Sequence, residues 1–160
     1  MLHINIICIG KLKEQYLKDA LNEYSKRLYK YCSLKIIELP DEKVPENLNA
    51  NIINKIKEIE SNNILSHIKN NSYTIALDLH GKQLSSEEFS LKIENIALNN
   101  NSNINFIIGG TFGLSDKLLK QATELISFSK MTFPHQLIRI FLLEQIFRAF
   151  KILSNEKYHH

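Results

Sequence analysis

The sequence predicts a single α/β domain with a mainly parallel sheet and helices on both faces. Two observations support this fold class. Short, nearly continuous apolar segments are typical of strands covered on both faces, and they alternate along the whole chain with amphipathic segments of helical spacing. The length of 160 residues suits one domain. No repeat, linker or change of composition divides the chain, so residues 1–160 are expected to fold together.

The first strand–helix unit begins at the N-terminus. Residues 2–9 are almost entirely apolar, which predicts a buried strand, and Gly10 ends it. Residues 14–31 carry apolar side chains at three- and four-residue spacing, which predicts an amphipathic helix. Cys8 lies in the strand and Cys32 follows the helix. Because neither belongs to a CxxC motif or has a metal-ligand partner nearby, both are expected to be buried thiols.

A second strand, a polar loop and a helix rich in isoleucine follow the first unit. Residues 34–39 predict a strand that stops at Pro40, and a long polar loop follows. Isoleucine and leucine at helical spacing then predict a helix over 52–69. The asparagines at 62 and 63 are expected to interrupt it, because asparagine is a poor helix former.

The third unit carries a helix-start signal. Residues 73–79 predict a strand ended by residues 80–81. Ser85 and Glu88 have the spacing of a capping box, in which each side chain satisfies a backbone N–H at a helix start. They are expected to open a helix that runs to about Leu98.

The last third of the chain supplies two more strands and two more helices. Residues 104–108 and 125–128 predict strands, and residues 115–123 predict a short helix. Pro134 is expected to be the first residue of the last helix, where its missing N–H costs nothing. That helix is apolar almost all round, so two of its sides should be buried. Either it meets a second subunit, which predicts a homodimer, or it is central in the monomer.

Arg139 falls inside the apolar arc of this last helix. An unpaired buried charge is costly, so the guanidinium must have a partner. One interpretation is a structural ion pair with an acidic residue. The other is a cation presented to a phosphate or carboxylate near a ligand pocket.

Charge and motif content narrow the possible functions. The net charge of +3 and the isoelectric point near 8.8 permit a polyanionic partner without requiring one. The apolar N-terminus lacks a basic leader and is too short to span a membrane, so we expect a cytoplasmic protein without membrane contact. Metal-ligand spacing, a nucleophile elbow and paired carboxylates are missing from the sequence. A reaction whose electrophile is supplied by a cofactor is therefore favoured.

Two strand ends that are close in sequence are expected to build one pocket. Gly109, Gly110 and Gly113 follow one of them, and a loop closed by Pro134 follows the other. The glycine spacing is neither GxGxxG nor a phosphate loop, which weakens dinucleotide and nucleoside-triphosphate interpretations. The tail at 158–160 is either disordered or offers an aromatic ring and an imidazole to a site.

Four motifs together carry a resemblance to a known family. They are LDLHGK at 77–82, FIIGGTFGLS at 106–115, SFSKMTFPHQLIRIFLLEQIFRAFKI at 127–152 and the closing Tyr158-His159. With the opening segment and the length, the sequence resembles the RlmH (YbeA-like) family over essentially the whole chain. These are SPOUT-class methyltransferases that modify a pseudouridine of large-subunit ribosomal RNA.

The resemblance implies a fold, a cofactor and a substrate. The fold would be a SPOUT α/β domain with a C-terminal trefoil knot. The enzyme would be a homodimer in which the tail of one subunit reaches the partner's site. It would use S-adenosylmethionine, without a metal, to methylate N3 of a pseudouridine in 23S ribosomal RNA on the assembled ribosome. The cofactor positions that carry over are Leu77, Gly109, Gly110, Phe128, Ser129, Lys130, Met131, Thr132 and Phe133.

The remaining site residues are expected from chemistry within that resemblance. His159 is the candidate for assisting deprotonation of N3, Tyr158 for positioning the base, and Arg139 and Arg148 for holding phosphate. Residues 111–112 and 157 depart from the family pattern. Two alternatives therefore remain open: a catalytically weak or inactive paralogue that binds the ribosome, and a SPOUT methyltransferase with another RNA substrate, such as a tRNA.

Overall fold

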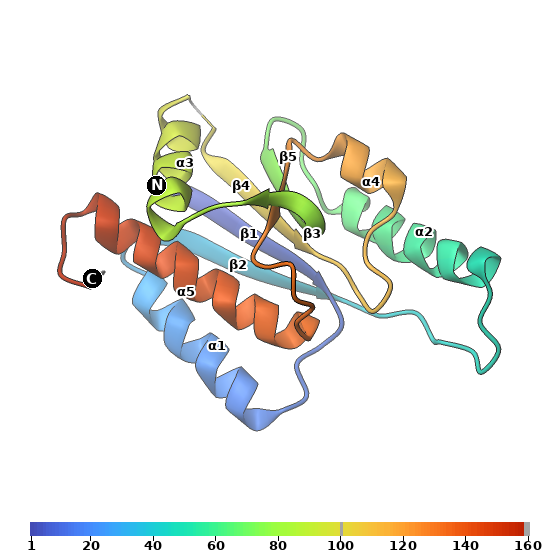
Figure 1. The fold of residues 1–160 in the computed structure, drawn as a ribbon. Helices are drawn as coiled ribbons and strands as arrows, with labels where there is room; N and C mark the ends of the chain where they lie inside the picture. Colours follow the sequence, from blue (N-terminus) through green and yellow to red (C-terminus); the bar gives the residue numbers. More distant parts are fainter. Residues whose placement is uncertain (100, 159–160) are drawn as a thin grey trace.

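A single sheet of five parallel strands forms the centre of the molecule (Figure 1). The computed structural model describes residues 1–99 and 101–158. The strand order is β2-β1-β4-β3-β5, and each neighbouring pair is parallel. The carboxyl ends of all five strands therefore meet at one edge of the sheet. The strands are β1 (Leu2–Ile9), β2 (Cys32–Leu39), β3 (Tyr73–Gln83), β4 (Asn103–Ile108) and β5 (Glu124–Ser127).

Helices cover both faces of the sheet, as the sequence predicts. α1, α3 and α5 pack on one face, and α2 and α4 on the other (Figure 1). Side chains of β1 alternate between the two cores, with Ile6 in the first and Ile7 in the second, so the strand is buried on both faces. The helices are α1 (Gln15–Leu28), α2 (Ala50–Ser66), α3 (Ser86–Leu98), α4 (Asp116–Gln121) and α5 (His135–Leu153).

Local signals for helix starts and buried thiols are confirmed. The Glu88 N–H donates to Ser85 Oγ at 3.1 Å, and the Ser85 N–H donates to a carboxylate oxygen of Glu88 at 2.7 Å, so the capping box is complete. Cys8 and Cys32 are both buried and unbridged. Burial raises the pKa of Cys8 to about 11 and that of Cys32 to about 12, so both thiols stay protonated and unreactive at neutral pH.

α2 is continuous, so the predicted interruption at residues 62–63 is wrong. Its N-cap is Asn49, whose side-chain oxygen accepts the Ile52 N–H at 2.9 Å. The buried positions Ile56, Glu60 and Ile64 recur every four residues and straddle the two asparagines. Burial of this stripe outweighs the weak helix propensity of asparagine.

β3 is longer than predicted, because it leaves the ladder and returns. It pairs with β5 up to Leu77, and the register shifts before pairing resumes at Lys82, which faces the same residue, Ile126. Residues 78–81 form the excursion. At Gly81 an added Cβ would lie 2.5–2.7 Å from backbone atoms of Ile126, so the two segments touch through their backbones. The predicted end at residues 80–81 is therefore the turn of this excursion rather than the end of the strand.

α5 lies centrally on its face of the sheet, with α1 on one side and α3 on the other (Figure 1). Pro134 is its N-cap with ψ of 135°, and the helix proper begins at His135, one residue later than predicted. The sheet and the two flanking helices bury one stripe of its apolar side chains, namely Leu142, Leu143, Ile146, Phe147 and Ala149. Its other apolar side chains are half-buried, and Phe141 is 41% exposed.

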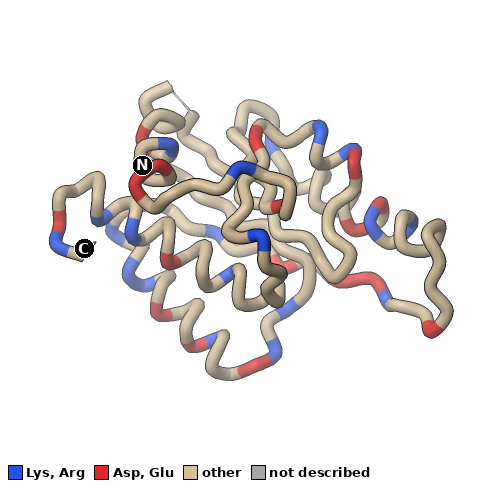
Figure 2. The backbone as a smooth tube through the Cα atoms, in the orientation of Figure 1, with Lys and Arg blue, Asp and Glu red and all other residues tan. Residues whose placement is uncertain are grey.

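The described part of the chain holds no helix that is both long and apolar enough to cross a membrane. Basic and acidic positions are interspersed along α1 and the neighbouring elements (Figure 2).

Candidate functional site

A cavity of about 940 Å³ opens at the carboxyl edge of the sheet. Three segments form its walls: residues 77–80 after the first part of β3, residues 108–114 after β4, and residues 126–138 from β5 into α5. Parallel α/β sheets bind ligands at this edge, where strand-end loops supply backbone groups. The two strand ends expected to share a pocket do so, and the β3 excursion adds a third wall.

The structure brings nearly all predicted cofactor residues to this cavity. Lys130 is the one exception: it does not line the cavity, although Ser129 and Met131 on either side of it do. The residues that line it are Leu77, Gly109, Gly110, Phe128, Ser129, Met131, Thr132 and Phe133.

The glycine segment forms a tight turn at the cavity wall. The Gly113 N–H donates to the Gly110 carbonyl at 3.1 Å, and Gly113 has a φ of +82°, where a side chain is strained. At Gly109 an added Cβ would lie 3.0 Å from the Gly113 backbone. A hydrogen bond to α2 holds the end of this segment, because the Ser115 N–H donates to Ser61 Oγ at 2.9 Å.

The loop after β5 is held by its own serines. Ser127 Oγ donates to the Ser129 carbonyl at 2.9 Å, and the Met131 N–H donates to Ser129 Oγ at 3.0 Å. Met131 is 72% exposed and Phe133 is 37% exposed. Large apolar side chains at the mouth of a cavity lose contact with water when a ligand covers them, which favours binding of a partly apolar molecule.

The polar cavity residues that the sequence interpretation did not assign to the site include Asp78, His80 and His135. The His80 N–H donates to an Asp78 carboxylate oxygen at 3.0 Å, so these two form the turn of the β3 excursion. Burial, with the nearby Arg139 charge, lowers the pKa of His135, so its imidazole is neutral at pH 7. The FPH motif contains His135, but only the fold shows that it begins α5 at the cavity.

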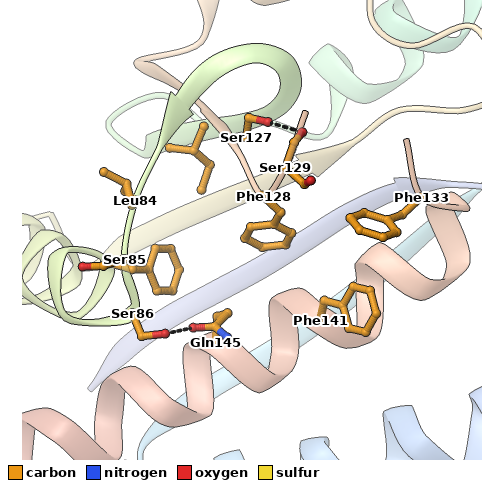
Figure 3. A pocket seen from close by; sticks show the side chains of 11 residues that line it. Leu84, Ser85, Ser86, Ser127, Phe128, Ser129, Phe133, Phe141 and Gln145 are labelled. Atoms are coloured by element: carbon orange, nitrogen blue, oxygen red, sulfur yellow. Dashed lines mark hydrogen bonds between the residues drawn. The ribbon is translucent and has the colours of Figure 1, made fainter. Parts of the chain in front are cut away.

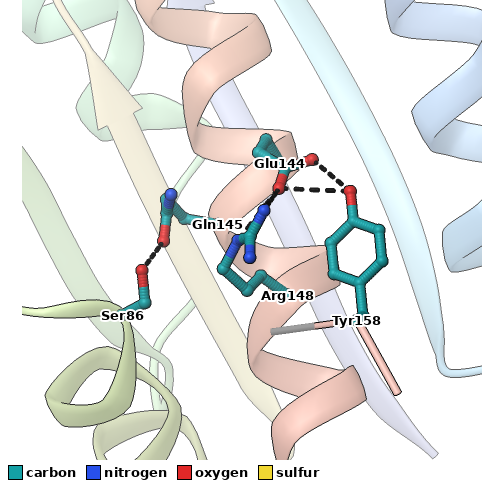
Figure 4. Close-up of polar contacts among 5 residues, drawn as sticks. All are labelled: Ser86, Glu144, Gln145, Arg148 and Tyr158. Atoms are coloured by element: carbon teal, nitrogen blue, oxygen red, sulfur yellow. Dashed lines mark hydrogen bonds and ion pairs between the residues drawn. The ribbon is translucent and has the colours of Figure 1, made fainter. Parts of the chain in front are cut away.

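Tyr158 and Arg148 do not line this cavity. Arg148 pairs with Glu144 at 2.7 Å, and the Tyr158 hydroxyl donates to the same carboxylate at 2.9 Å (Figure 4). The guanidinium carbon of Arg148 also lies 4.7 Å from the centre of the Tyr158 ring. The expected catalytic residue His159 lies outside the described residues. Tyr158 is thus fixed to residues 144–148 of α5.

Arg139 has the structural ion pair that was one of its two interpretations. Its guanidinium is fully buried, donates to Glu38 at 2.7 Å and donates to the Gly10 carbonyl at 3.1 Å. A side chain with no exposed surface does not reach a polyanion outside the protein. We therefore assign Arg139 to holding α5 against the β1 and β2 ends, in place of the expected phosphate contact.

Glu60 is a buried acid behind the glycine turn. It is 4% exposed, one carboxylate oxygen accepts the Glu42 N–H at 2.9 Å, and the other has no partner among the described residues. The unpartnered oxygen would lie 2.9 Å from a Cβ added at Gly110. Burial, assisted by the nearby carboxylates of Asp41 and Glu42, raises the pKa of Glu60 above its usual value of 4.5.

This pKa makes stability depend on pH. A raised folded-state pKa stabilises the fold fully below pH 4.5, and the contribution is lost as pH rises through the folded-state value. Glu60→Gln removes that loss, so its stability relative to wild type is expected to increase from pH 4 to pH 8 in urea denaturation. Glu58→Gln, at an exposed position of the same helix, is the matched control and should show no such trend. A constant difference between Glu60→Gln and wild type across this range would contradict the assignment.

Among residues 1–99 and 101–158, no group of three or more His, Cys, Asp or Glu side chains is placed to hold a metal ion.

Comparisons with known proteins identify the class. The family model described as "Predicted SPOUT methyltransferase" matches residues 2–159. The chain therefore belongs to the SPOUT methyltransferase family. More particular names come from curated relatives that are called ribosomal RNA large subunit methyltransferase H. One from Clostridium botulinum is 59% identical over 158 residues, and one from Clostridium perfringens is 56% identical; both alignments cover 99% of each chain. The resemblance to the RlmH family is confirmed.

Solved structures support the fold at much lower sequence identity. A probable methylase family protein from Haemophilus influenzae superimposes with a TM-score of 0.55 at 12% identity, covering 98% of this chain and 70% of that one. A methylase family protein from Neisseria gonorrhoeae gives a TM-score of 0.51 at 11% identity, covering 98% and 95%. The α/β fold class is thus shared with methylase-family structures.

Proposed function

We propose that this protein is an S-adenosylmethionine-dependent methyltransferase that modifies N3 of a pseudouridine in 23S ribosomal RNA on the assembled ribosome. The observation that carries the proposal is the full-length relationship to proteins named ribosomal RNA large subunit methyltransferase H. The assembled ribosome exists in the cytoplasm, so we place the protein there. The target nucleotide and atom come from the family resemblance.

The cavity fits the cofactor in size, chemistry and position. Its volume of about 940 Å³ lies near the upper end of the range of small-molecule sites. Leu77 and the loop 128–133 offer apolar surface to an adenine ring, and the turn 109–113 brings backbone close to the ligand. When bound, S-adenosylmethionine supplies a methyl group made electrophilic by its sulfonium. The protein must then align N3 with that methyl group and help the N3 proton to leave.

The C-terminal tail supports a homodimeric arrangement. Tyr158 is fixed to Glu144 at the middle of α5 and does not line the cavity, which adjoins the start of that helix at residues 134–138. A tail held there serves a neighbouring subunit's cavity more readily than its own. We propose that α5, with its exposed Phe141, faces the partner, and that the tail completes the partner's site.

The proposal includes the trefoil knot of SPOUT proteins. What supports it is the match of residues 2–159 to the SPOUT methyltransferase family model.

The ribosomal RNA of a deletion strain is the decisive test. Mass mapping of its 23S RNA is expected to show one pseudouridine lacking its methyl group, restored by a plasmid copy of the wild-type gene. Calorimetry with S-adenosylmethionine is expected to show one site per protomer. A modification that stays intact in the strain without any copy of the gene would overturn the substrate assignment, and absence of cofactor binding would favour an inactive ribosome-binding paralogue.

His159→Ala tests the proposed proton acceptor. A general base contributes about 100-fold or more, so single-turnover methylation of ribosomes should fall by at least that factor while cofactor affinity stays unchanged. Lys157→Ala is the matched control in the same tail, and its rate should equal that of wild type. If His159→Ala methylates at the wild-type rate, His159 takes no part in the chemistry, and the neutral His135 in the cavity becomes the candidate base.

A further inference from the structure

The cavity at the carboxyl edge of the sheet reaches both faces of the sheet. Leu77 and Phe128 line it and pack against the core that α1, α3 and α5 cover. Figure 3 shows the Phe128 ring together with the hydrogen bond from Ser127 to Ser129 that holds this loop. On the other face, Leu119 of α4 lines the cavity and packs against the second core. The two sides of the cavity can therefore hold different parts of one ligand.

The side formed by α2 and α4 carries two opposite charges, because Lys57 and Asp116 both line the cavity there. These two helices lie beside each other (Figure 1). The Ser115 N–H donates to Ser61 Oγ at 2.9 Å, and Asp116 is the next residue along the chain. Lys57 precedes Ser61 by four residues, so their side chains lie on the same face of α2. This hydrogen bond therefore brings the two charges to the same part of the cavity.

The two charges are not paired. Lys57 is half-buried and Asp116 is exposed. Neither side chain has a hydrogen bond or an ion pair with any described residue, so the ammonium and the carboxylate are too far apart to pair with each other. The other carboxylate in the described lining, Asp78, already accepts the His80 N–H. A ligand that carries both signs of charge can bridge Lys57 and Asp116.

We propose that Lys57 and Asp116 bind the amino-acid end of S-adenosylmethionine, with Lys57 donating to its carboxylate and Asp116 accepting from its ammonium. The inference rests on the proposed function, because it concerns the cofactor of the same reaction. The sulfonium joins the amino-acid end to the adenosine. Holding the adenine on one side of the cavity and the amino acid on the other fixes the methyl group between them.

The charges favour an amino acid over an RNA phosphate at this position. Lys57 is the one lysine or arginine among the described residues that line the cavity, whereas Asp78 and Asp116 bring two carboxylates to it. A phosphate held by Lys57 would be repelled by both carboxylates. An amino-acid end carries one negative and one positive group on the same carbon, so it can satisfy the lysine and the acid together.

Three ligands separate the amino-acid end from the rest of the cofactor. S-adenosylmethionine and S-adenosylhomocysteine carry this end, and 5′-methylthioadenosine lacks it. Lys57→Met and Asp116→Asn are each expected to bind the first two ligands about 10-fold more weakly in calorimetry, because each variant loses a charged partner of the ligand. Both variants should bind 5′-methylthioadenosine with wild-type affinity, which also reports an intact cavity.

Two further substitutions on α2 are the matched controls. Lys55→Met and Glu58→Gln each remove an exposed charge that does not line the cavity. Both variants should bind all three ligands with wild-type affinity.

The outcomes separate this inference from the proposed function. Wild-type affinity of either cavity variant for S-adenosylmethionine would overturn the inference and leave the methyltransferase assignment in place. An equal loss of affinity for 5′-methylthioadenosine would identify a change in the shape of the cavity. A loss in Asp116→Asn that is confined to S-adenosylmethionine would place Asp116 at the sulfonium. Either result overturns the inference, and failure of the wild-type protein to bind S-adenosylmethionine would overturn both proposals.

Discussion

Gly81→Ala is expected to destabilise the protein by about 3 kcal/mol or more, because the new methyl group meets backbone rather than a movable side chain. Its Cβ would lie 2.5–2.7 Å from three backbone atoms of Ile126. Relief requires β5 or the excursion at 78–81 to move, and both carry walls of the cavity. Cofactor affinity should therefore fall together with the free energy of unfolding, as measured by calorimetry and urea denaturation.

Gly110→Ala is the comparison for this prediction. The nearest atom to its added Cβ is a carboxylate oxygen of Glu60 at 2.9 Å, at the far end of a flexible side chain that can shift, and the Ile9 Cγ2 methyl follows at 3.0 Å. Gly110→Ala should therefore lower the free energy of unfolding by only about 1 kcal/mol. If both variants lowered the free energy of unfolding by the same amount, the backbone contact at Gly81 would not be the cause of a larger loss.

Glu38→Gln is expected to cost about 3 kcal/mol, because it leaves the Arg139 charge buried without a counter-charge. One carboxylate oxygen of Glu38 accepts from Arg139 at 2.7 Å and from the Leu12 N–H at 2.9 Å. The amide retains an acceptor for both donors, so the loss measured by urea denaturation reports mainly the charge.

Replacing the other partner of this ion pair should lower the free energy of unfolding by less. Arg139→Met leaves Glu38, whose side chain is 33% exposed and can be hydrated, and it keeps an unbranched side chain in the core. The double variant should be more stable than Glu38→Gln alone, since the uncompensated charge is gone. An Arg139→Met variant that is less stable than Glu38→Gln would show that the guanidinium contributes chiefly by other contacts.

Local patterns predicted the parts of this fold that depend on neighbours in sequence. The apolar run of β1 and the Ser85–Glu88 capping box are each encoded within a few residues, and both are present. The parallel sheet followed from the alternation of strands with helices. The strand-end loops at 109–113 and 128–133 were found because the carboxyl edge of such a sheet brings them together.

The parts that could not be predicted depend on contacts between distant residues. Arg139 needed a partner, but nothing in the sequence selects Glu38, which lies 101 positions away. The return of β3 to the ladder at Lys82 depends on Gly81 lying against Ile126, which only the assembled sheet reveals. The contact between the start of α3 and α5 could not be predicted for the same reason, because Ser86 donates to Gln145, which lies 59 positions further along the chain.

The strand order also has a consequence for how the protein is made. β1 pairs in register with β4, so Asn5 faces Asn105, and the cavity needs segments from residue 77 to residue 138. Such distant pairings close large loops, which slows folding. During synthesis, the N-terminal strand must wait for most of the chain before it gains its second neighbour. The cavity at the carboxyl edge of the sheet is therefore complete only once the chain has folded as far as residue 138.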